Sequence, residues 1–219
     1  TAERIISEAE TWDKLDDHEN IVSVIDYGSE PLPWIAMEYM DAGHVGEHAG
    51  QWGFEEGLEV AIPVAQAVRH AHRKGVAHLD LKPGNVLLKS GNGRGYVPKV
   101  ADWGLSKQLL EHSKSIEGLS PQYAAPEQFD DSYGSKDDVT DIYQLGAVFY
   151  EMFTGRSPFE GEPTMVMNEI LNEQPPPPSS VADVPPEIDS VLLKAMSKRK
   201  EDRHESVLYL RDELKGLRS

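Results

Sequence analysis

Four polar side chains stand in a fixed order over a short stretch of this chain. Asp80, Lys82 and Asn85 lie within one segment, and Asp102 begins an Asp-Trp-Gly sequence further along. Such an aspartate can orient a hydroxyl and accept its proton, and a lysine two residues on in an extended loop can place a positive charge on the same side. The side-chain oxygens of Asn85 and Asp102 are ligands of the kind that Mg²⁺ prefers. The set predicts phosphoryl transfer, which depends on positioning and charge neutralisation more than on covalent help.

Each of these residues alone has a plainer interpretation. A lone aspartate before Leu-Lys-Pro is usually a turn or cap residue, Asp-x-Gly is a common turn, and single short motifs are weak evidence. The ordered set outweighs these interpretations because it continues along the chain with Ser120-Pro121-Gln122-Tyr123-Ala124-Ala125-Pro126-Glu127, Asp141 with Gly146, and Arg203.

Together these segments resemble the eukaryotic-type Ser/Thr protein kinases, with His78-Leu79-Asp80 in the place of their His-Arg-Asp and Asp102-Trp103-Gly104 in the place of Asp-Phe-Gly. The resemblance implies an α+β fold in which a partial small lobe, of one helix and two strands, sits on a mainly α-helical large lobe. It assigns residues 1–40 to the small lobe and hinge and residues 41–219 to the large lobe. It also implies ATP and Mg²⁺ as cofactors and a Ser or Thr hydroxyl of a protein as the acceptor.

The resemblance implies a role for each site residue. Asp80, Lys82 and Asn85 would be catalytic, and Asn85 and Asp102 would bind Mg²⁺. The segment 37–43 looks like the hinge, where backbone groups of Glu38 and Met40 would hydrogen-bond the adenine of ATP. Leu87 would lie beneath the adenine, and Asp102 would also contact ATP through the metal. Backbone recognition leaves almost no side-chain signature, and Met37 could equally be core filler.

A second group of residues would position the site. Asp141 would cap the backbone of the catalytic loop, Ser120 would bring its hydroxyl near the catalytic Asp and Lys, and Glu127 would form a buried ion pair with Arg203. Glu8 falls where the family's regulatory helix carries a Glu that pairs with a strand Lys. That Lys is absent from this sequence, so a solvated helix charge is an open alternative for Glu8.

Hydrophobic periodicity and turn residues predict the elements that must hold these side chains. The expected elements are a helix over 2–15, a hairpin of buried strands over 21–27 and 34–39, a helix over 54–74 closed by Gly75, a strand pair over 86–88 and 97–101, a helix over 139–154, a stiff proline connector over 175–178, and helices over 186–196 and 205–217.

Composition sets broad limits. The chain has 219 residues, a formal net charge of −17 and no cysteine. A field of that sign repels polyphosphate backbones, which argues against a nucleic-acid partner. The lack of cysteine excludes a disulfide framework and suits a cytoplasmic protein, and no apolar run approaches the length of a membrane span. The acids are scattered along the chain, which suggests an acidified, halophilic surface, with an ordinary acidic mesophile as the alternative.

If the acidic surface is halophilic, the melting temperature should rise steeply from low salt to molar KCl, because salt screens the repulsion between like charges. Thermal unfolding at a series of KCl concentrations measures this. A melting temperature that stays flat across the series would contradict the hypothesis.

Two departures from the family pattern are informative. The sequence contains no Gly-rich loop and no Val-Ala-x-Lys strand before the first helix, and it begins without Met. We therefore expect it to be a segment of a longer protein, inactive by itself, and call the chain with its upstream residues the parent domain. The second departure is Leu79, which replaces an Arg that can pair with a phosphorylated activation loop.

Two other classes of function are weighed against the kinase. The missing strands favour a pseudokinase-like binding or scaffold module, but such a module does not require all four polar residues of the set. Pro83-Gly84-Asn85 is similar to the loop of small-molecule kinases of the aminoglycoside or choline type. Those enzymes generally lack the Lys of Asp-x-Lys and the Ala-Pro-Glu segment.

Overall fold

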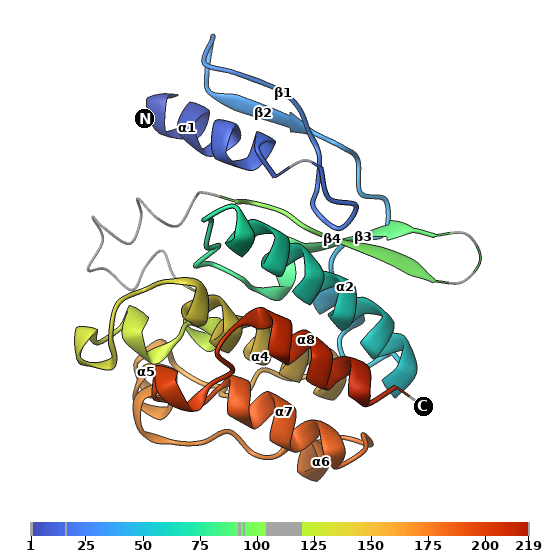
Figure 1. The fold of residues 1–219 in the computed structure, drawn as a ribbon, viewed down its shortest axis with the longest axis vertical. Coiled ribbons are helices and arrows are strands. Elements are labelled where there is room, and N and C mark those ends of the chain that lie inside the picture. Colours follow the sequence, from blue (N-terminus) through green and yellow to red (C-terminus); the bar gives the residue numbers. More distant parts are fainter. Residues whose placement is uncertain (1, 16, 92, 94, 104–119, 219) are drawn as a thin grey trace.

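The computed structural model describes residues 2–15, 17–91, 93, 95–103 and 120–218 (Figure 1). Its helices and strands are α1 (Ala2–Asp13), β1 (Val24–Gly28), β2 (Trp34–Met37), α2 (Phe54–Arg73), β3 (Val86–Ser90), β4 (Tyr96–Val100), α4 (Asp138–Thr154), α5 (Pro163–Asn172), α6 (Pro178–Val181), α7 (Glu187–Ala195) and α8 (Val207–Gly216). Figure 1 shows α1 and the β1–β2 hairpin at one end, above a larger and mainly helical part. The predicted α+β arrangement is confirmed.

The end of the molecule with α1 and the hairpin is tied to the larger part through β4. β1 and β2 pair antiparallel, as do β3 and β4. Between α1 and β1, the N–H of Val22 donates to the carbonyl of Val100 (3.0 Å), and the N–H of Val100 donates to the carbonyl of Asn20 (2.8 Å). The indole N–H of Trp12 on α1 donates to the carbonyl of Val22 (2.7 Å). α1 is therefore anchored through the same segment that joins β4.

Two sequence predictions about local structure are wrong in part. The hairpin is buried at Ile21, Val22 and Val24, but Ile25, Trp34 and Met37 are 70%, 41% and 43% exposed. An apolar run specifies a strand but not which of its faces another element covers. The proline connector is also shorter than predicted, since Pro178 is the first residue of α6; proline is well suited to the first turn of a helix, where its missing N–H costs nothing.

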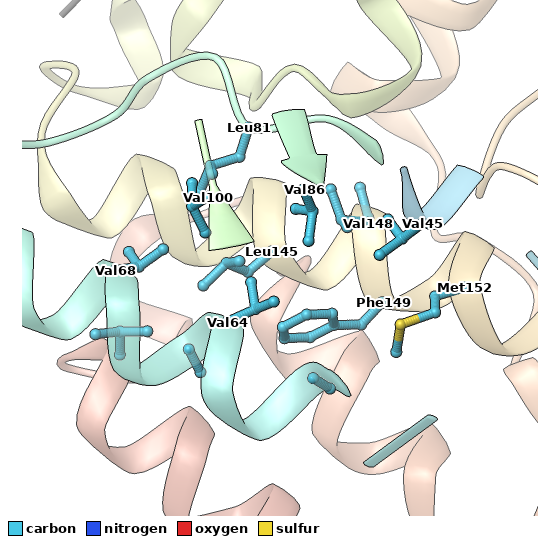
Figure 2. Packing of buried hydrophobic residues seen from close by; sticks show 14 of the residues in the cluster. Val45, Val64, Val68, Leu81, Val86, Val100, Leu145, Val148, Phe149 and Met152 are labelled. Carbon is cyan, nitrogen blue, oxygen red and sulfur yellow. The ribbon is translucent and has the colours of Figure 1, made fainter. Parts of the chain in front are cut away.

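The core lies between α2, α4 and the β3–β4 pair. Figure 2 shows Val64 and Val68 of α2 facing Leu145 and Phe149 of α4, with Val86 beyond them, and all five are buried. The spacing of these residues on each helix produces the apolar face that the sequence predicts. The two long helices of the larger part thus form a rigid support for the loop between α2 and β3.

The ends of the long helices follow from local sequence. α2 begins where the N–H of Gly53 donates to the carboxylate of Glu56 (3.0 Å), and its last residue, Arg73, is followed closely by Gly75, whose φ of +76° favours glycine. α4 begins where Asp137 accepts from the N–H of Val139 (3.0 Å) and ends at Gly155 in the left-handed conformation. No helix in the part of the chain that the structure describes is both long and apolar enough to cross a membrane.

Candidate active site

The loop between α2 and β3 is held from below by Asp141 of α4. Its carboxylate is fully buried and accepts hydrogen bonds from the backbone N–H groups of His78 (2.8 Å) and Leu79 (2.7 Å). Leu79 has a φ of +65°, a conformation that costs a non-glycine residue about 1–3 kcal/mol. The two charge-assisted bonds offset that cost, and the contact between Asp141 and the loop is the one that the sequence predicts.

Two histidines also hold the loop between α2 and β3 in place. Nε2 of His72 on α2 lies 2.7 Å from Oδ2 of Asp141. The ring of His78 accepts from the N–H of Asp80 at Nδ1 (3.2 Å), so its Nε2 carries the proton and donates to the carbonyl of Ala101 (2.9 Å). The same ring packs edge-on against Trp103, with centroids 4.8 Å apart. His78 thereby connects the catalytic loop to the residues on both sides of Asp102.

Two buried glutamines clamp the backbone around Leu79. The side-chain amides of Gln128 and Gln144 both donate to the carbonyl of Leu79, at 2.9 Å and 3.3 Å, and Gln144 also donates to the amide oxygen of Gln128 (3.0 Å). The amide oxygens accept from the backbone N–H groups of Leu81 (3.1 Å) and Ala125 (2.9 Å). The clamp joins the catalytic loop, the segment 125–128 and α4 without any charged group.

Sequence reasoning missed these glutamines and His72. A signal was present for Gln144, because it lies three residues after Asp141 on the apolar helix α4 and therefore on the same face. Gln128 carries no comparable signal, since its partners come from distant segments of the chain.

Asp80 and Lys82 meet at the open side of the loop. Nζ of Lys82 lies 3.7 Å from Oδ2 of Asp80, and the side chains are 33% and 26% exposed. Burial raises the pKa of the Asp80 carboxyl above its ordinary value, although the charge of Lys82 opposes the shift and the charge of Asp102 adds to it. A partly buried carboxylate beside a cation is suited to accept a proton and to orient a hydroxyl.

Asn85 and Asp102 are brought together by backbone hydrogen bonds. The Asn85 amide donates to the carbonyl of Asp80 (2.8 Å), which leaves its side-chain oxygen available as a ligand. The carbonyl of Asn85 accepts from the N–H of Ala101 (2.9 Å), directly before Asp102, whose φ is +61°. Oxygen donors in this arrangement fit Mg²⁺. The described residues contain no cluster of three or more His, Cys, Asp or Glu that could hold a metal, so phosphate and water oxygens would have to complete its coordination.

The predicted hinge follows β2 in the chain and forms hydrogen bonds with β3. The N–H of Ala42 donates to the carbonyl of Leu88 (3.1 Å), and the N–H of Leu88 donates to the carbonyl of Gly43 (2.9 Å), which places the hinge beside Leu87. The N–H of Glu38 donates to the carbonyl of Ser23 (3.0 Å), so this N–H is not available to a ligand. Met40 is partly buried against the core.

The carboxylate of Glu38 has a structural role that the sequence did not suggest. It accepts from Lys99 (2.6 Å), from Lys89 (3.4 Å) and from the N–H of Ser23 (3.0 Å). Burial by itself would raise the pKa of Glu38, but the hydrogen bonds from Lys99 and Ser23 hold it below its ordinary value. The hinge is therefore fixed to β4 through an ion pair.

The structure places Glu8 and Ser120, two further site residues predicted from the sequence, differently from their predictions or alternatives. Glu8 is only 4% exposed, so the alternative of a solvated helix charge is wrong. Within the described part of the chain, the hydroxyl of Ser120 makes no hydrogen bond to Asp80 or Lys82; Ser120 instead precedes the turn Pro121–Tyr123. Residues 104–119, which include Ser113 and Ser115, lie outside the described residues.

Glu127 and Arg203 form the predicted buried ion pair. Nη1 and Nη2 of Arg203 donate to the two carboxylate oxygens of Glu127 at 2.7 Å and 2.8 Å, and both side chains are 0% exposed. Arg203 also donates to three backbone carbonyls, and Thr140 donates to Glu127. Since Gln128 follows Glu127 directly, this pair fixes the segment from which one arm of the glutamine clamp comes.

The fold and this loop define a catalytic lobe of the protein-kinase class. The chain belongs to the protein kinase family, because residues 1–211 match the protein kinase domain. It is 34% identical over 214 residues to the serine/threonine-protein kinase PknB of Mycolicibacterium smegmatis, covering 90% of this chain and 33% of that protein. To the serine/threonine-protein kinase Pkn1 of Myxococcus xanthus it is 35% identical over 207 residues, covering 90% of this chain and 29% of that protein.

Solved structures agree with this assignment. The kinase domain of PknI from Mycobacterium tuberculosis superimposes with a TM-score of 0.75 at 27% sequence identity, covering 98% of this chain and 78% of that chain. The chain spans about a third of the length of the two curated relatives (33% and 29%).

Proposed function

We propose that this chain is the catalytic part of a serine/threonine protein kinase, which transfers the γ-phosphate of Mg-ATP to a Ser or Thr hydroxyl of a protein. The proposal rests on the loop 78–85, where a buried frame built from Asp141 and the two glutamines presents Asp80, Lys82 and Asn85 beside Asp102. A cytoplasmic location and the domain boundaries at residues 40 and 41 are further parts of the proposal.

Each side chain has a distinct role in the proposed reaction. Asp80 orients the acceptor hydroxyl and takes its proton, and Lys82 places its charge on the phosphoryl group as it moves. Mg²⁺ supplies charge neutralisation at the phosphates when it is bound, and the oxygens of Asn85 and Asp102 would hold it. The carbonyl of Glu38 and the N–H of Met40 orient the adenine, with Leu87 beneath it. The frame keeps these groups aligned, because small misplacements are costly in catalysis.

The two alternative functions make different demands on the site. A scaffold module does not need a proton acceptor, a cation and two metal ligands on one clamped loop. A small-molecule kinase does not need Lys82 or the segment Ala125–Glu127, which the ion pair to Arg203 locks in place.

The proposal is tested with the parent domain, Mg-ATP and a mixture of Ser-, Thr- and Tyr-containing protein substrates. We expect phosphate on Ser and Thr, and we expect Asp102→Ala to abolish the Mg²⁺-dependent part of ATP binding, because a metal ligand is lost. Nucleotide binding without phosphotransfer in the unaltered domain would favour the scaffold. Transfer to aminoglycosides or choline and not to protein would favour the small-molecule kinase.

We further predict that the parent domain is active without phosphorylation of the hydroxyls of Ser113, Ser115 and Ser120, in the segment from Asp102 to Glu127 that resembles an activation loop. An Arg at position 79 would gain a partner from a loop phosphate, but Leu79 is apolar and 6% exposed, and its carbonyl is held by two amides. Control would then come from α1 around Glu8 or from a partner. Initial rates measured after phosphatase treatment, before any autophosphorylation, should equal those of the untreated protein.

A different cation could still supply a pocket for a loop phosphate, and Lys107, which lies outside the described residues, is the candidate. A fall in rate of about tenfold or more after phosphatase treatment, equivalent to about 1.4 kcal/mol in the barrier, would show that the loop phosphate matters. The interpretation of Leu79 would then be wrong.

A further inference from the structure

A basic pocket lies on the side of α2 that faces α8. It has a volume of about 240 Å³ and is lined by His18, Gln66, Arg69, His70, Arg73 and Arg211. None of these lining residues is acidic. His18 comes from the segment between α1 and β1, Arg211 comes from α8, and the others come from α2. Figure 1 shows α2 and α8 running side by side.

This concentration of positive charge is unusual for the chain. Acidic residues outnumber Lys and Arg by 38 to 21, yet three arginines and two histidines gather here. Gln66, Arg69, His70 and Arg73 follow the spacing that places residues on one face of a helix. Arg69 and Arg73 are therefore neighbours of like charge, an arrangement that weakens an isolated helix. An anion in the pocket would compensate for that repulsion.

The arginines are available to such an anion. In the part of the chain that the structure describes, Arg69 and Arg73 form no ion pair with a carboxylate. Arg211 uses Nε and Nη2 on its neighbour Asp212, at 3.0 Å and 2.6 Å to the same oxygen. Its remaining guanidinium N–H groups can still reach a ligand, because a guanidinium has five donors.

Two acidic residues contact lining residues of the pocket, Asp17 through His70 and Asp212 through Arg211. Oδ1 of Asp17 lies 2.8 Å from Nε2 of His70 and 2.8 Å from Nζ of Lys74, so its charge is shared between two partners. The charges of Glu19 and Asp17 oppose, but do not reverse, the lowering of the His18 pKa by burial. Lys74 does not line the pocket, so the positive charge available to a ligand comes from Arg69 and Arg73, which have no carboxylate partner in the described part of the chain.

His18 adds a neutral hydrogen-bond donor to the pocket. Its Nδ1 accepts from the N–H of Asn20 (3.1 Å), so the proton of the neutral ring is on Nε2. The rings of His18 and His70 are 4.9 Å apart. Burial, and next the charge of His70, lower the pKa of His18. His18 is therefore mostly neutral at pH 7, and its Nε2 proton can be donated to a ligand.

We propose that this pocket binds a dianionic phosphate group, supplied either as free inorganic phosphate or as the phosphomonoester of a phosphorylated serine. Guanidinium groups match the geometry of phosphate oxygens. The volume of about 240 Å³ is below the roughly 300–1,000 Å³ typical of sites for larger ligands, which favours one phosphate group over a nucleotide. The bound group would link the segment after α1 to α2 and α8, and the site does not depend on the proposed kinase activity.

Binding is tested on the full chain by titration with inorganic phosphate and, separately, with O-phosphoserine, at an ionic strength held constant with KCl. We expect saturable heat in calorimetry and a saturable rise in melting temperature, because a ligand that binds the folded state stabilises it. A response to both ligands supports recognition of the phosphate group that they share. A response to one alone identifies the source of the phosphate group. No saturable response to either, beyond that of KCl, overturns the proposal.

Substitutions in the pocket test whether phosphate binds there. Arg69→Gln/Arg73→Gln should weaken phosphate binding by about tenfold or more, since two charge-assisted contacts are lost. The control Arg156→Gln/Lys215→Gln removes the same charge at exposed positions outside the pocket and should bind as the unaltered chain does. His18→Gln/Arg211→Gln provides a second pocket variant if the first does not fold.

A Lys82→Met variant separates this pocket from the catalytic loop, where phosphate could also bind. It should keep the full response to phosphate. Loss of binding in Lys82→Met, or wild-type affinity in a folded pocket variant, would overturn the proposal.

Discussion

Replacing Asp80 by Asn in the parent domain is expected to lower kcat by about 10²-fold or more while Mg-ATP binding stays nearly intact. Asparagine has almost the same shape as aspartate, so the contacts of the loop are retained, but it cannot accept the proton of the acceptor hydroxyl. Asp80 does not belong to the pair of residues that would hold the metal, which is why nucleotide affinity should not follow kcat. Steady-state phosphotransfer and ATP titration with Mg²⁺ measure the two quantities separately.

The pH dependence of kcat provides a second test of the role of Asp80. Burial raises the pKa of Asp80, so at a given pH more of it is protonated than an exposed carboxyl would be. The proton acceptor must be ionised, and kcat should therefore fall with decreasing pH at values above the ordinary range for aspartate, about 4. Asp80→Asn should lose this acidic limb. The matched control is Asp183→Asn at an exposed position; a fully active Asp80→Asn enzyme would remove Asp80 from its proposed role.

Replacing Arg203 by Met is expected to lower the free energy of unfolding by about 3–5 kcal/mol, because the carboxylate of Glu127 would remain buried without its partner. The pair is bidentate and both side chains are 0% exposed. Urea unfolding followed by circular dichroism measures the loss. Activity of the parent domain should fall as well, since the pair holds the segment that carries Gln128 against the catalytic loop.

The control for this substitution is Lys194→Met, which breaks the exposed pair between Lys194 and Glu213, whose side chains are 44% and 39% exposed. Such surface pairs contribute about 0–1 kcal/mol. The double variant Arg203→Met/Glu127→Leu should recover part of the stability lost in Arg203→Met, since it also removes the unpaired charge. A loss below about 1 kcal/mol in Arg203→Met would contradict the role given to the pair.

Prediction from the sequence was most accurate where local pattern determines structure. Apolar spacing and glycine stops located α2 and α4, because a helix buries one face and needs a residue such as Gly75 or Gly155 to end it. It was less accurate for the β1–β2 hairpin, where an apolar run specified strands but their exposure depends on which elements lie against them. The contact between Asp141 and the catalytic loop was predictable only through resemblance, since nothing local to residue 141 indicates a partner more than sixty residues away.

The sequence by itself determined the chemistry available to this protein: the types and order of Asp80, Lys82, Asn85 and Asp102, and the absence of a charge at Leu79. The tertiary structure decided how that chemistry is held and where other charge gathers. The glutamine clamp, the ion pair from Glu38 to Lys99, and the basic pocket each join segments distant in the chain. Hydrogen bonds and charge clusters of this kind depend on distances in space, and periodicity along a chain carries no information about such distances until the helices have packed.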